Sequence, residues 1–133
     1  MATRRTFASL GSVTQPAATP HDPDCVFCRI VAGEIPATVV AQDDQAIAFR
    51  DLEPQAPLHV LVIPRAHYAD VGALAHADPD ALVAVARLAA QVAADENGGQ
   101  FRFVFNSGPQ AQQTVFHAHG HVIGGRDMTW PPG

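Results

Sequence analysis

The sequence predicts an α+β domain: a mainly antiparallel sheet of five strands, one long helix and one short helix. Two observations indicate this fold class. About five short apolar runs are bounded by turn-forming residues, as β-strands usually are. One other stretch repeats its apolar residues at helical spacing over several turns, which predicts a single long helix.

The first predicted elements are a short helix and two strands. We expect the helix to span Cys25–Ala32, with Asp24 as its N-cap and Gly33 as the residue that ends it. Strands are expected over 38–42 and 46–51, joined by a short polar turn.

A buried strand and the long helix follow. The strand is expected at His59–Ile63, with Pro64 ending it. The helix begins at the N-cap Asp78 with Pro79 in its first turn, and Asn97-Gly98-Gly99 ends it. Its predicted apolar stripe consists of Leu82, Val85, Ala86, Ala89 and Val92.

Two strands complete the predicted sheet. The residues 101–106 alternate in polarity as a strand does, and 107–113 form a loop. We expect the last strand to span 114–123.

Three histidines alternate along that last strand. Because side chains of a strand alternate between its faces, His117, His119 and His121 should all point to one side. Ala118 and Gly120 lie between them and are small, as expected if a helix packs closely on the opposite face. A single histidine on an apolar face is usually structural, but three in strict alternation indicate a functional site.

Two chemistries suit such a row: metal chelation, or attack of a neutral imidazole on phosphorus while a second imidazole moves the proton. Neutral hydrogen-bonding side chains near the mouth of the strand favour phosphorus chemistry, because they can hold phosphoryl oxygens. These are Asn106, Ser107, Gln113 and Thr114. Asn106 is equally typical of a turn. Asp51, at a strand end, is either a solvated edge residue or a carboxylate that accepts two ribose hydroxyls.

Composition narrows the class of protein. The chain has 133 residues, enough for one domain, and 47% hydrophobic residues, enough for a buried core. Its net charge of -5 argues against a nucleic-acid partner, which would favour a basic face. We expect no membrane partner, because no apolar run is long enough to span a bilayer.

The N-terminal residues differ from the rest. We expect 1–21 to be a disordered tail and 22–133 to be the domain. No hydrophobic segment typical of a secretory signal follows Arg4 and Arg5, so we expect a cytoplasmic protein.

Cys25 and Cys28 form a C-x-x-C pair, which suggests metal or redox chemistry in a reducing compartment. No thioredoxin-like βαβ pattern surrounds the pair, which favours a metal. The alternative is that both cysteines are small buried apolar groups.

The chain resembles the histidine-triad superfamily, and its Hint branch in particular. The signature is His117-Ala-His119-Gly-His121-Val-Ile, and the resemblance covers about 23–133. Further matching motifs are Ala46-Phe49-Asp51, Pro54-Gln55-Ala56-Pro57, His59-Val-Leu-Val-Ile-Pro64, His67, the strand with Asn106, Gln113 and the ending Gly124 to Trp130-Pro131-Pro132-Gly133.

This resemblance implies hydrolysis of purine nucleoside phosphoramidates, derivatives of AMP or GMP, by a homodimer whose sheet continues across the two-fold axis. His119 would be the nucleophile that becomes nucleotidylated, and His121 would contact the phosphate and assist proton transfer. His117 and His59 would complete the catalytic cluster. The nucleotide-binding residues implied are Val26, Phe27, Ile30 and Leu52 around the base, Asp51 on the ribose, Asn106, Gln113 and Thr114 on the phosphate, and Trp130 reaching the partner subunit's site.

The resemblance also bears on the metal. Some members with this C-x-x-C hold a structural zinc, which implies Cys25, Cys28, His67 and His117 as ligands here. Four protein ligands leave no open position, so such a zinc would stabilise the fold and orient His117. No cofactor is required for the reaction itself.

The chain departs from the usual family pattern at two places. Thr114 stands where serine is usual, and Ala118 and Gly120 are smaller than the usual residues, so the helix behind the strand should sit nearer or leave a small void.

Two other functions stay open. One is hydrolysis or phosphorolysis of dinucleoside polyphosphates, and the other is a nucleotide- or zinc-binding interaction module without significant catalysis.

Overall fold

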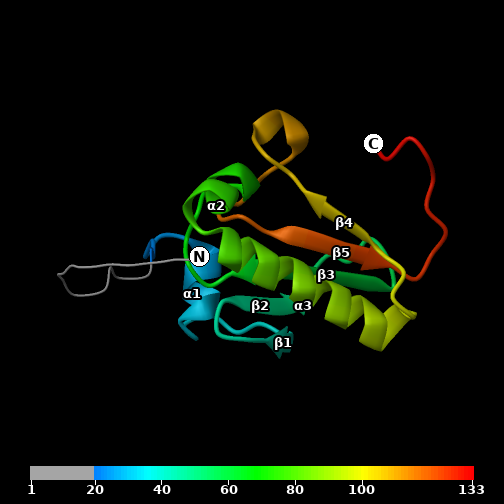
Figure 1. Cartoon of the computed structure of the whole chain (residues 1–133), viewed down its shortest axis with the longest axis horizontal. Helices are drawn as coiled ribbons and strands as arrows, with labels where there is room; N and C mark the ends of the chain where they lie inside the picture. Colours follow the sequence, from blue (N-terminus) through cyan, green and yellow to red (C-terminus); the bar gives the residue numbers. More distant parts are fainter. Residues whose placement is uncertain (1–19) are drawn as a thin grey trace, which may run out of the picture.

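The computed structural model describes residues 20–133, and its sheet has five strands that are all antiparallel to their neighbours. The strand order is β1-β2-β3-β5-β4, so β1 and β4 form the two edges (Figure 1). The strands are β1 (Val39–Gln42), β2 (Ala46–Arg50), β3 (Leu58–Pro64), β4 (Arg102–Phe105) and β5 (Gly120–Gly124). This architecture confirms the predicted α+β class and agrees with each predicted strand except the last to within about one residue at most ends.

Helices cover both faces of the sheet. The long helix α3 (Pro79–Asn97) packs on the face formed by Ala48, Val60 and Val122. The short helix α1 (Val26–Val31) packs on the opposite face through Phe27. Figure 1 shows α3 crossing the strands and α1 lying near one end of the sheet. Within residues 20–133, no helix combines the length and the hydropathy needed to cross a membrane.

The ends of α3 agree with the prediction. The side chain of Asp78 accepts a hydrogen bond from the Ala81 backbone N–H at 3.1 Å, which satisfies one of the free donors of the first turn. Gly98 ends the helix in the left-handed conformation, with φ 62°. Most of the predicted stripe is confirmed, since Val85, Ala89 and Val92 are buried and Leu82 is half-buried. Ala86 is exposed instead, and Leu88 and Ala93 are buried in addition.

Two local predictions about helices were wrong. The N-cap of α1 is Cys25, whose Sγ accepts from the Cys28 backbone N–H, whereas the Asp24 N–H donates to Asp22. A helix that the sequence analysis missed, α2 (Val71–Ala77), begins at the N-cap Asp70 and ends where α3 begins. Glycine inside α2 weakens its sequence signal.

The last strand is shorter than predicted, because β5 begins only at Gly120. The preceding residues, 114–119, are not paired with a neighbouring strand. Instead, the Ala118 N–H donates to the Tyr68 carbonyl at 2.7 Å, in the connection between β3 and α2. His117 and His119 therefore lie in an extended approach to the strand, and only His121 lies within it.

The face behind the histidines is covered differently from our expectation. Ala118 does pack against helical residues, Leu74 of α2 and Ala81 of α3. Gly120 instead lies under the ring of Phe103, from the neighbouring strand β4. An aromatic ring, rather than a closer helix or a void, occupies the space beside this glycine.

The predicted tail, residues 1–21, lies mostly outside the described residues. Its last two residues are described, and the Pro20 carbonyl accepts a hydrogen bond from the His67 backbone N–H at 2.8 Å. The chain is thus already attached to the domain at residue 20.

Candidate active site and metal centre

A cavity of about 400 Å³ opens beside the histidines, between α1, the end of β2 and the approach to β5. Its lining contains eight of the residues that the sequence analysis assigned to catalysis or nucleotide binding. These are Val26, Phe27, Ile30, Asp51, Leu52, Thr114, His119 and His121. The cavity therefore brings together the apolar, ribose-side and catalytic candidates.

The apolar side of the cavity is a slot with aromatic walls. The rings of Phe27 and Phe49 pack edge to face with their centroids 5.6 Å apart, and Phe27 also lies 5.1 Å from the His119 ring. Leu52 is 96% exposed at the rim. Such a surface can bury a flat ring without making demands on its hydrogen bonds.

Sequence reasoning missed part of this slot. Residues 35–38, between α1 and β1, line it together with Leu61 and Val115. Strand alternation could have placed Leu61 on the same face as His59. The connecting segment carries no comparable signal.

The backbone fixes the protonation pattern of His119. Its Nδ1 lies 2.8 Å from the His117 carbonyl oxygen. A carbonyl can only accept, so Nδ1 carries the proton and Nε2 keeps a free lone pair. Burial lowers the pKa of His119, which keeps the imidazole neutral near pH 7. The lone pair on His119 Nε2 can therefore act as a nucleophile.

His59 and His121 are linked in a second chain of hydrogen bonds. The Gln55 backbone N–H donates to His59 Nδ1 at 2.9 Å, so the proton of neutral His59 is on Nε2. His59 Nε2 lies 2.9 Å from His121 Nδ1 and donates to it, which leaves His121 with an Nε2–H. Asp51 is also near, 3.4 Å from His59 Nε2.

Burial, reinforced by the neighbouring His119 and His59, lowers the pKa of His121 to about 4, although Asp51 opposes this shift. His121 is therefore neutral near pH 7. Beside the bare Nε2 of His119, the cavity thus has an N–H donor: one imidazole can attack while the other donates a hydrogen bond to the group attacked.

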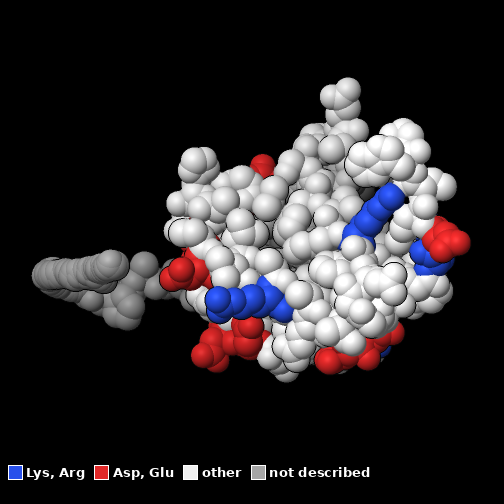
Figure 2. Space-filling view, turned by 45° about the vertical axis from the view of Figure 1, so that its right-hand side comes forward, with Lys and Arg blue, Asp and Glu red and all other residues white. Residues whose placement is uncertain are grey.

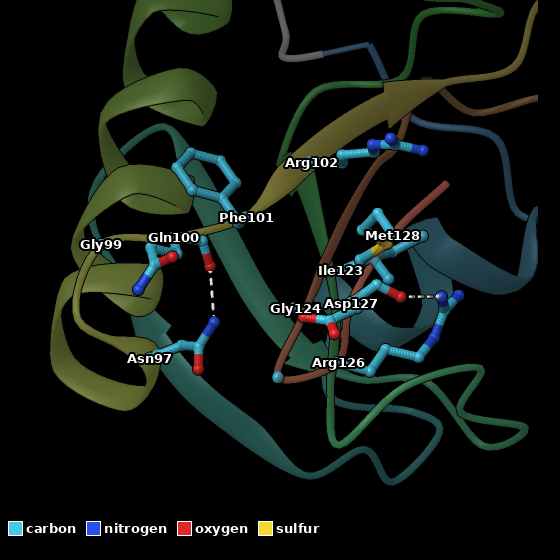
Figure 3. A pocket seen from close by; sticks show the side chains of 11 residues that line it. Asn97, Gly99, Gln100, Phe101, Arg102, Ile123, Gly124, Arg126, Asp127 and Met128 are labelled. Carbon is cyan, nitrogen blue, oxygen red and sulfur yellow. Dashed lines mark hydrogen bonds between the residues drawn. The ribbon is translucent and has the colours of Figure 1, made fainter. Parts of the chain in front are cut away.

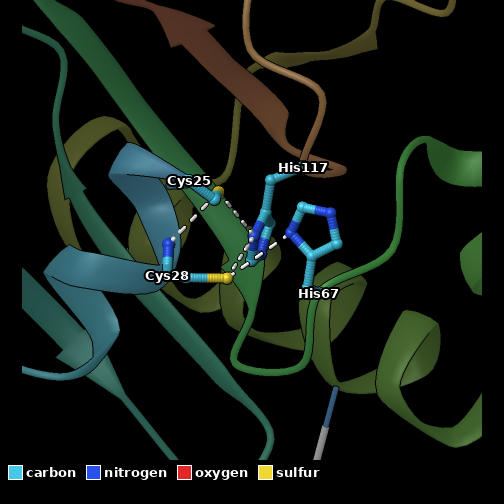
Figure 4. A group of neighbouring side chains, drawn as sticks. All are labelled: Cys25, Cys28, His67 and His117. Carbon is cyan, nitrogen blue, oxygen red and sulfur yellow. Dashed lines mark hydrogen bonds between the residues drawn. The ribbon is translucent and has the colours of Figure 1, made fainter. Parts of the chain in front are cut away.

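The three alternating histidines lie within residues 117–121, which we call the histidine segment. A second cluster lies at its His117 end, and Figure 4 shows the four side chains of this cluster converging. Cys25 and Cys28 come from the start of α1, His67 follows β3, and His117 precedes β5. Three distances between ligand atoms are 3.4 Å (Cys28 Sγ to His67 Nδ1), 3.5 Å (Cys25 Sγ to His117 Nδ1) and 3.6 Å (Cys28 Sγ to His117 Nδ1). Sulfur and nitrogen ligands of a tetrahedral zinc ion lie about 3.6 Å apart, so this geometry fits the metal.

Neighbouring groups of this cluster support the same conclusion. His117 Nε2 donates to the Pro64 carbonyl at 2.8 Å, which leaves its Nδ1 lone pair facing the sulfur atoms. Burial lowers the pKa of His117 to about 4 and raises the pKa of Cys28 to about 11. Without a cation, the cluster is a neutral imidazole facing a thiol. A divalent cation would stabilise the thiolate.

A third group of potential ligands, Asp51, His59 and His121, fits a metal poorly. A metal on His59 Nε2 would require the proton on Nδ1. That nitrogen already accepts a hydrogen bond from Gln55. The three side chains are better described as a hydrogen-bonded chain.

Three predicted nucleotide-binding residues lie outside the cavity lining. Asn106 donates to the Ala111 carbonyl at 2.7 Å, as a turn residue does. Gln113 is buried and donates to the carbonyls of Ala69 and Val115, which holds the loop before Thr114 in place. Trp130 is 81% exposed and stacks beside Arg102, with 5.8 Å from the guanidinium carbon to the ring centroid.

A larger cavity of about 660 Å³ lies between the end of α3, the start of β4 and the residues after β5 (Figure 3). Three of its polar side chains, those of Asn97, Arg102 and Arg126, donate hydrogen bonds to backbone carbonyls. Asn97 donates to the Gln100 carbonyl, and Arg126 donates to the carbonyls of Gln55 and Asp127. No cysteine or histidine is among its described lining residues, so the catalytic candidates belong to the smaller cavity.

The charged surface gives little indication of a polyanionic partner. On the face that Figure 2 shows, the basic side chains of the described residues stand singly or beside acidic ones. Among the described residues, Arg50 pairs with Glu96 through two hydrogen bonds of 2.7 and 2.9 Å.

Comparisons with known proteins identify the family and support the fold. The HIT domain family matches residues 32–128. An Arabidopsis thaliana protein named adenylylsulfatase HINT1 is 46% identical over 88% of this chain and 82% of its own length. A 14 kDa zinc-binding protein of Brassica juncea is 45% identical, over 83% of this chain and all of its own length. The crystal structure of a HIT family hydrolase from Legionella pneumophila superposes with a TM-score of 0.78, at 45% identity, covering 83% of this chain and all of that chain.

Proposed function

The chain belongs to the HIT domain family, and we propose that this nucleotide-binding hydrolase cleaves purine nucleoside phosphoramidates through a nucleotidylated His119. One observation carries the proposal. The Nδ1 of His119 is committed to the His117 carbonyl, so its Nε2 lone pair is free beside the cavity. Hydrolase relatives support the reaction type, and the site supports the covalent route.

The first step is an exchange of bonds at the α-phosphorus. His119 Nε2 attacks, a nitrogen–phosphorus bond forms to the histidine, and the bond to the leaving amine breaks with its electron pair remaining on the amine. The anionic phosphate bound beside His121 favours the protonated form of that imidazole. The amine takes the Nε2 proton of this imidazolium, which leaves His121 neutral. The Thr114 hydroxyl, which lines the cavity, can donate to a phosphoryl oxygen.

The second step regenerates the enzyme. Water attacks the phosphorus of the nucleotidylated His119 and gives up a proton to His121, and the bond between histidine and phosphorus breaks. The nucleoside monophosphate leaves, and both imidazoles return to their starting protonation. In this arrangement Asp51 would hold the ribose and the Phe27–Phe49 slot would hold the base.

The charge of the lining favours a substrate with one phosphate. Arg50 is the only arginine among the described lining residues, and Glu96 already neutralises it. A polyphosphate would bring several negative charges to a site of neutral donors. This argues for phosphoramidates over dinucleoside polyphosphates.

A second candidate substrate is adenylyl sulfate, because a relative at 46% identity is named adenylylsulfatase. The attack on phosphorus would be the same, but sulfate can leave without a proton, whereas an amine cannot. Replacing His121 with Gln should therefore slow adenosine phosphoramidate cleavage more than adenylyl sulfate cleavage. Equal slowing of both substrates would contradict the role of His121 as proton donor.

We further propose a structural zinc at Cys25, Cys28, His67 and His117. These four residues would hold the ion, and it would stabilise the fold and orient His117. Support comes from the distances in the cluster and from a relative named a zinc-binding protein.

The assembly and location of the protein are proposals as well. We propose a homodimer that pairs the outer edges of two β4 strands, because β4 is a sheet edge with no neighbour on its outer side within residues 20–133. Trp130, exposed on the segment after β5, would then be available to the partner's site. Two free cysteines are compatible with the cytoplasm.

The covalent step is tested by intact-mass spectrometry of a rapidly quenched reaction with an adenosine phosphoramidate. We expect an adduct of one adenylyl group, mapped by fragmentation to His119. Tight AMP binding without adduct or substrate loss would overturn the proposal in favour of a binding module.

A further inference from the structure

Gly120 separates the two reacting histidines, and its backbone is closed from the face opposite the cavity. A Cβ built on Gly120 would overlap the Cε1 and Cζ atoms of the Phe103 ring and would lie 3.0 Å from Phe105 Cζ. No side chain larger than hydrogen fits here unless the ring moves. The ring of Phe103 therefore lies directly against the backbone between His119 and His121.

The ring of Phe103 is itself held by its neighbours. Its centroid lies 4.8 Å from that of Phe105 and 6.2 Å from that of Phe101, and all three pack on the core under α3. In the pairing of β4 with β5, Phe103 stands opposite Val122, which is fully buried. Phe103 is half-buried, and its contacts with Phe101 and Phe105 limit how far the ring can move.

The position of Gly120 gives this contact its importance. Pairing of β5 with β3 begins at Gly120, opposite Val62, so His119 lies just before the first paired residue. Gly120 is thus the residue that joins His119 to the sheet. The ring of Phe103 packs against Gly120 on the side away from the cavity.

We propose that Phe103 is a positioning residue for the reaction, because its ring, in the place of a side chain at 120, fixes how far His119 and His121 project toward the substrate. This inference rests on the proposed function of that site. Phe103 touches no substrate and acts only through the backbone of Gly120.

The proposal predicts that two harmful substitutions repair each other. Phe103→Leu empties space behind Gly120, and Gly120→Ala forces the ring away, so each should slow formation of the adenylyl adduct about tenfold. Affinity for AMP should change little, because Phe27 and Phe49 are untouched. The double variant should recover most of the rate, since the new methyl group fills the emptied space.

Phe101→Leu is the matched control. It makes the same change in the same aromatic row, but Phe101 is not among the nearest neighbours of Gly120. It should lower thermal stability as Phe103→Leu does and leave the adduct rate within about twofold. Equal slowing by Phe101→Leu, or single effects that multiply in the double variant, would overturn the proposal. An unchanged rate in Phe103→Leu would do the same, even if Gly120→Ala failed to fold.

A spectroscopic readout separates this proposal from the proposed function. With ¹³C-labelled histidine and no substrate, the ring signals of His119 and His121 should shift in Phe103→Leu and return in the double variant. Phe101→Leu should leave them in place. If the wild-type protein cleaved no phosphoramidate, the proposed function would fail while these signals would still test the position of the imidazoles. Unmoved signals in Phe103→Leu would contradict the positioning role alone.

Discussion

The two ends of the histidine segment use the same side chain in opposite ways. At the cysteine end, the Nδ1 atoms of His67 and His117 converge with two sulfur atoms. At the cavity end, His119 keeps a lone pair on Nε2 and His121 keeps an N–H on its own Nε2. For His117, His119 and His121, the difference arises from the second nitrogen of the ring, since its backbone or histidine partner decides what the first nitrogen can do.

This comparison predicts that the cysteine end determines stability and the cavity end determines rate. His119→Ala should produce the largest effect on rate, a loss of adduct formation by at least about a thousandfold. The midpoint of thermal unfolding should change little, because His117 and the other three proposed metal ligands remain. Rapid-quench kinetics measure the rate of adduct formation, and a thermal melting curve measures the stability.

The exposed His76 on α2 provides the control for that prediction. His76→Ala removes a histidine outside both clusters and should leave rate and stability near wild type. If His119→Ala retained most of the wild-type turnover, the nucleophile would have to be another group.

Cys28→Ser tests the other end of the comparison. We expect loss of zinc by elemental analysis and a decrease in the free energy of unfolding of about 3 kcal/mol or more, because a buried metal ligand is lost. The chelated wild-type protein is the control: it should be as unstable as the variant, and chelation should not destabilise the variant further. Full stability after the loss of zinc would contradict a structural role of the metal.

The sequence predicts both ends as candidate sites, and the reason lies in the residues themselves. A C-x-x-C pair and three alternating histidines have few other uses, so His117, His119 and His121 were visible as a site before their contacts were known. Their geometry was less visible. Strand alternation placed all three in one strand, but β5 begins at Gly120, since Ala118 bonds to the Tyr68 carbonyl.

Contacts between distant residues could not be predicted. Nothing in the sequence around Gly120 indicates that Phe103, on another strand, supplies the ring above it. Gln113 and Asn106 likewise satisfy carbonyls of their own loop and segments beside it, which depend on the folded path of the chain. Local patterns predict elements and ligand types, whereas partners across the sheet come only from the fold.

A smaller effect concerns the pH dependence of stability. The pKa of His121 is about 4 in the folded protein and near 6.5 when exposed, so folding disfavours its protonation. The loss of stability caused by burying His121 is absent above about pH 6.5 and grows as the pH falls toward 4. His121→Gln should therefore weaken the loss of stability over this range, as measured by denaturant unfolding at several pH values. An unaltered slope in His121→Gln would show that the pKa of His121 is not lowered in the folded protein.

The smallest expected effect distinguishes the two aspartates expected to cap helices. Asp78 accepts the Ala81 N–H and caps α3, so Asp78→Ala should cost about 1 kcal/mol. Asp24 caps nothing, because Cys25 takes that place at α1, and Asp24→Ala should stay within about 0.5 kcal/mol. Denaturant unfolding of the two variants decides the point. An equal cost at Asp24 and Asp78 would mean that Asp24, and not Cys25, is the N-cap of α1, so that this helix begins one residue earlier. Cys25 would then not act both as the helix cap and as a metal ligand.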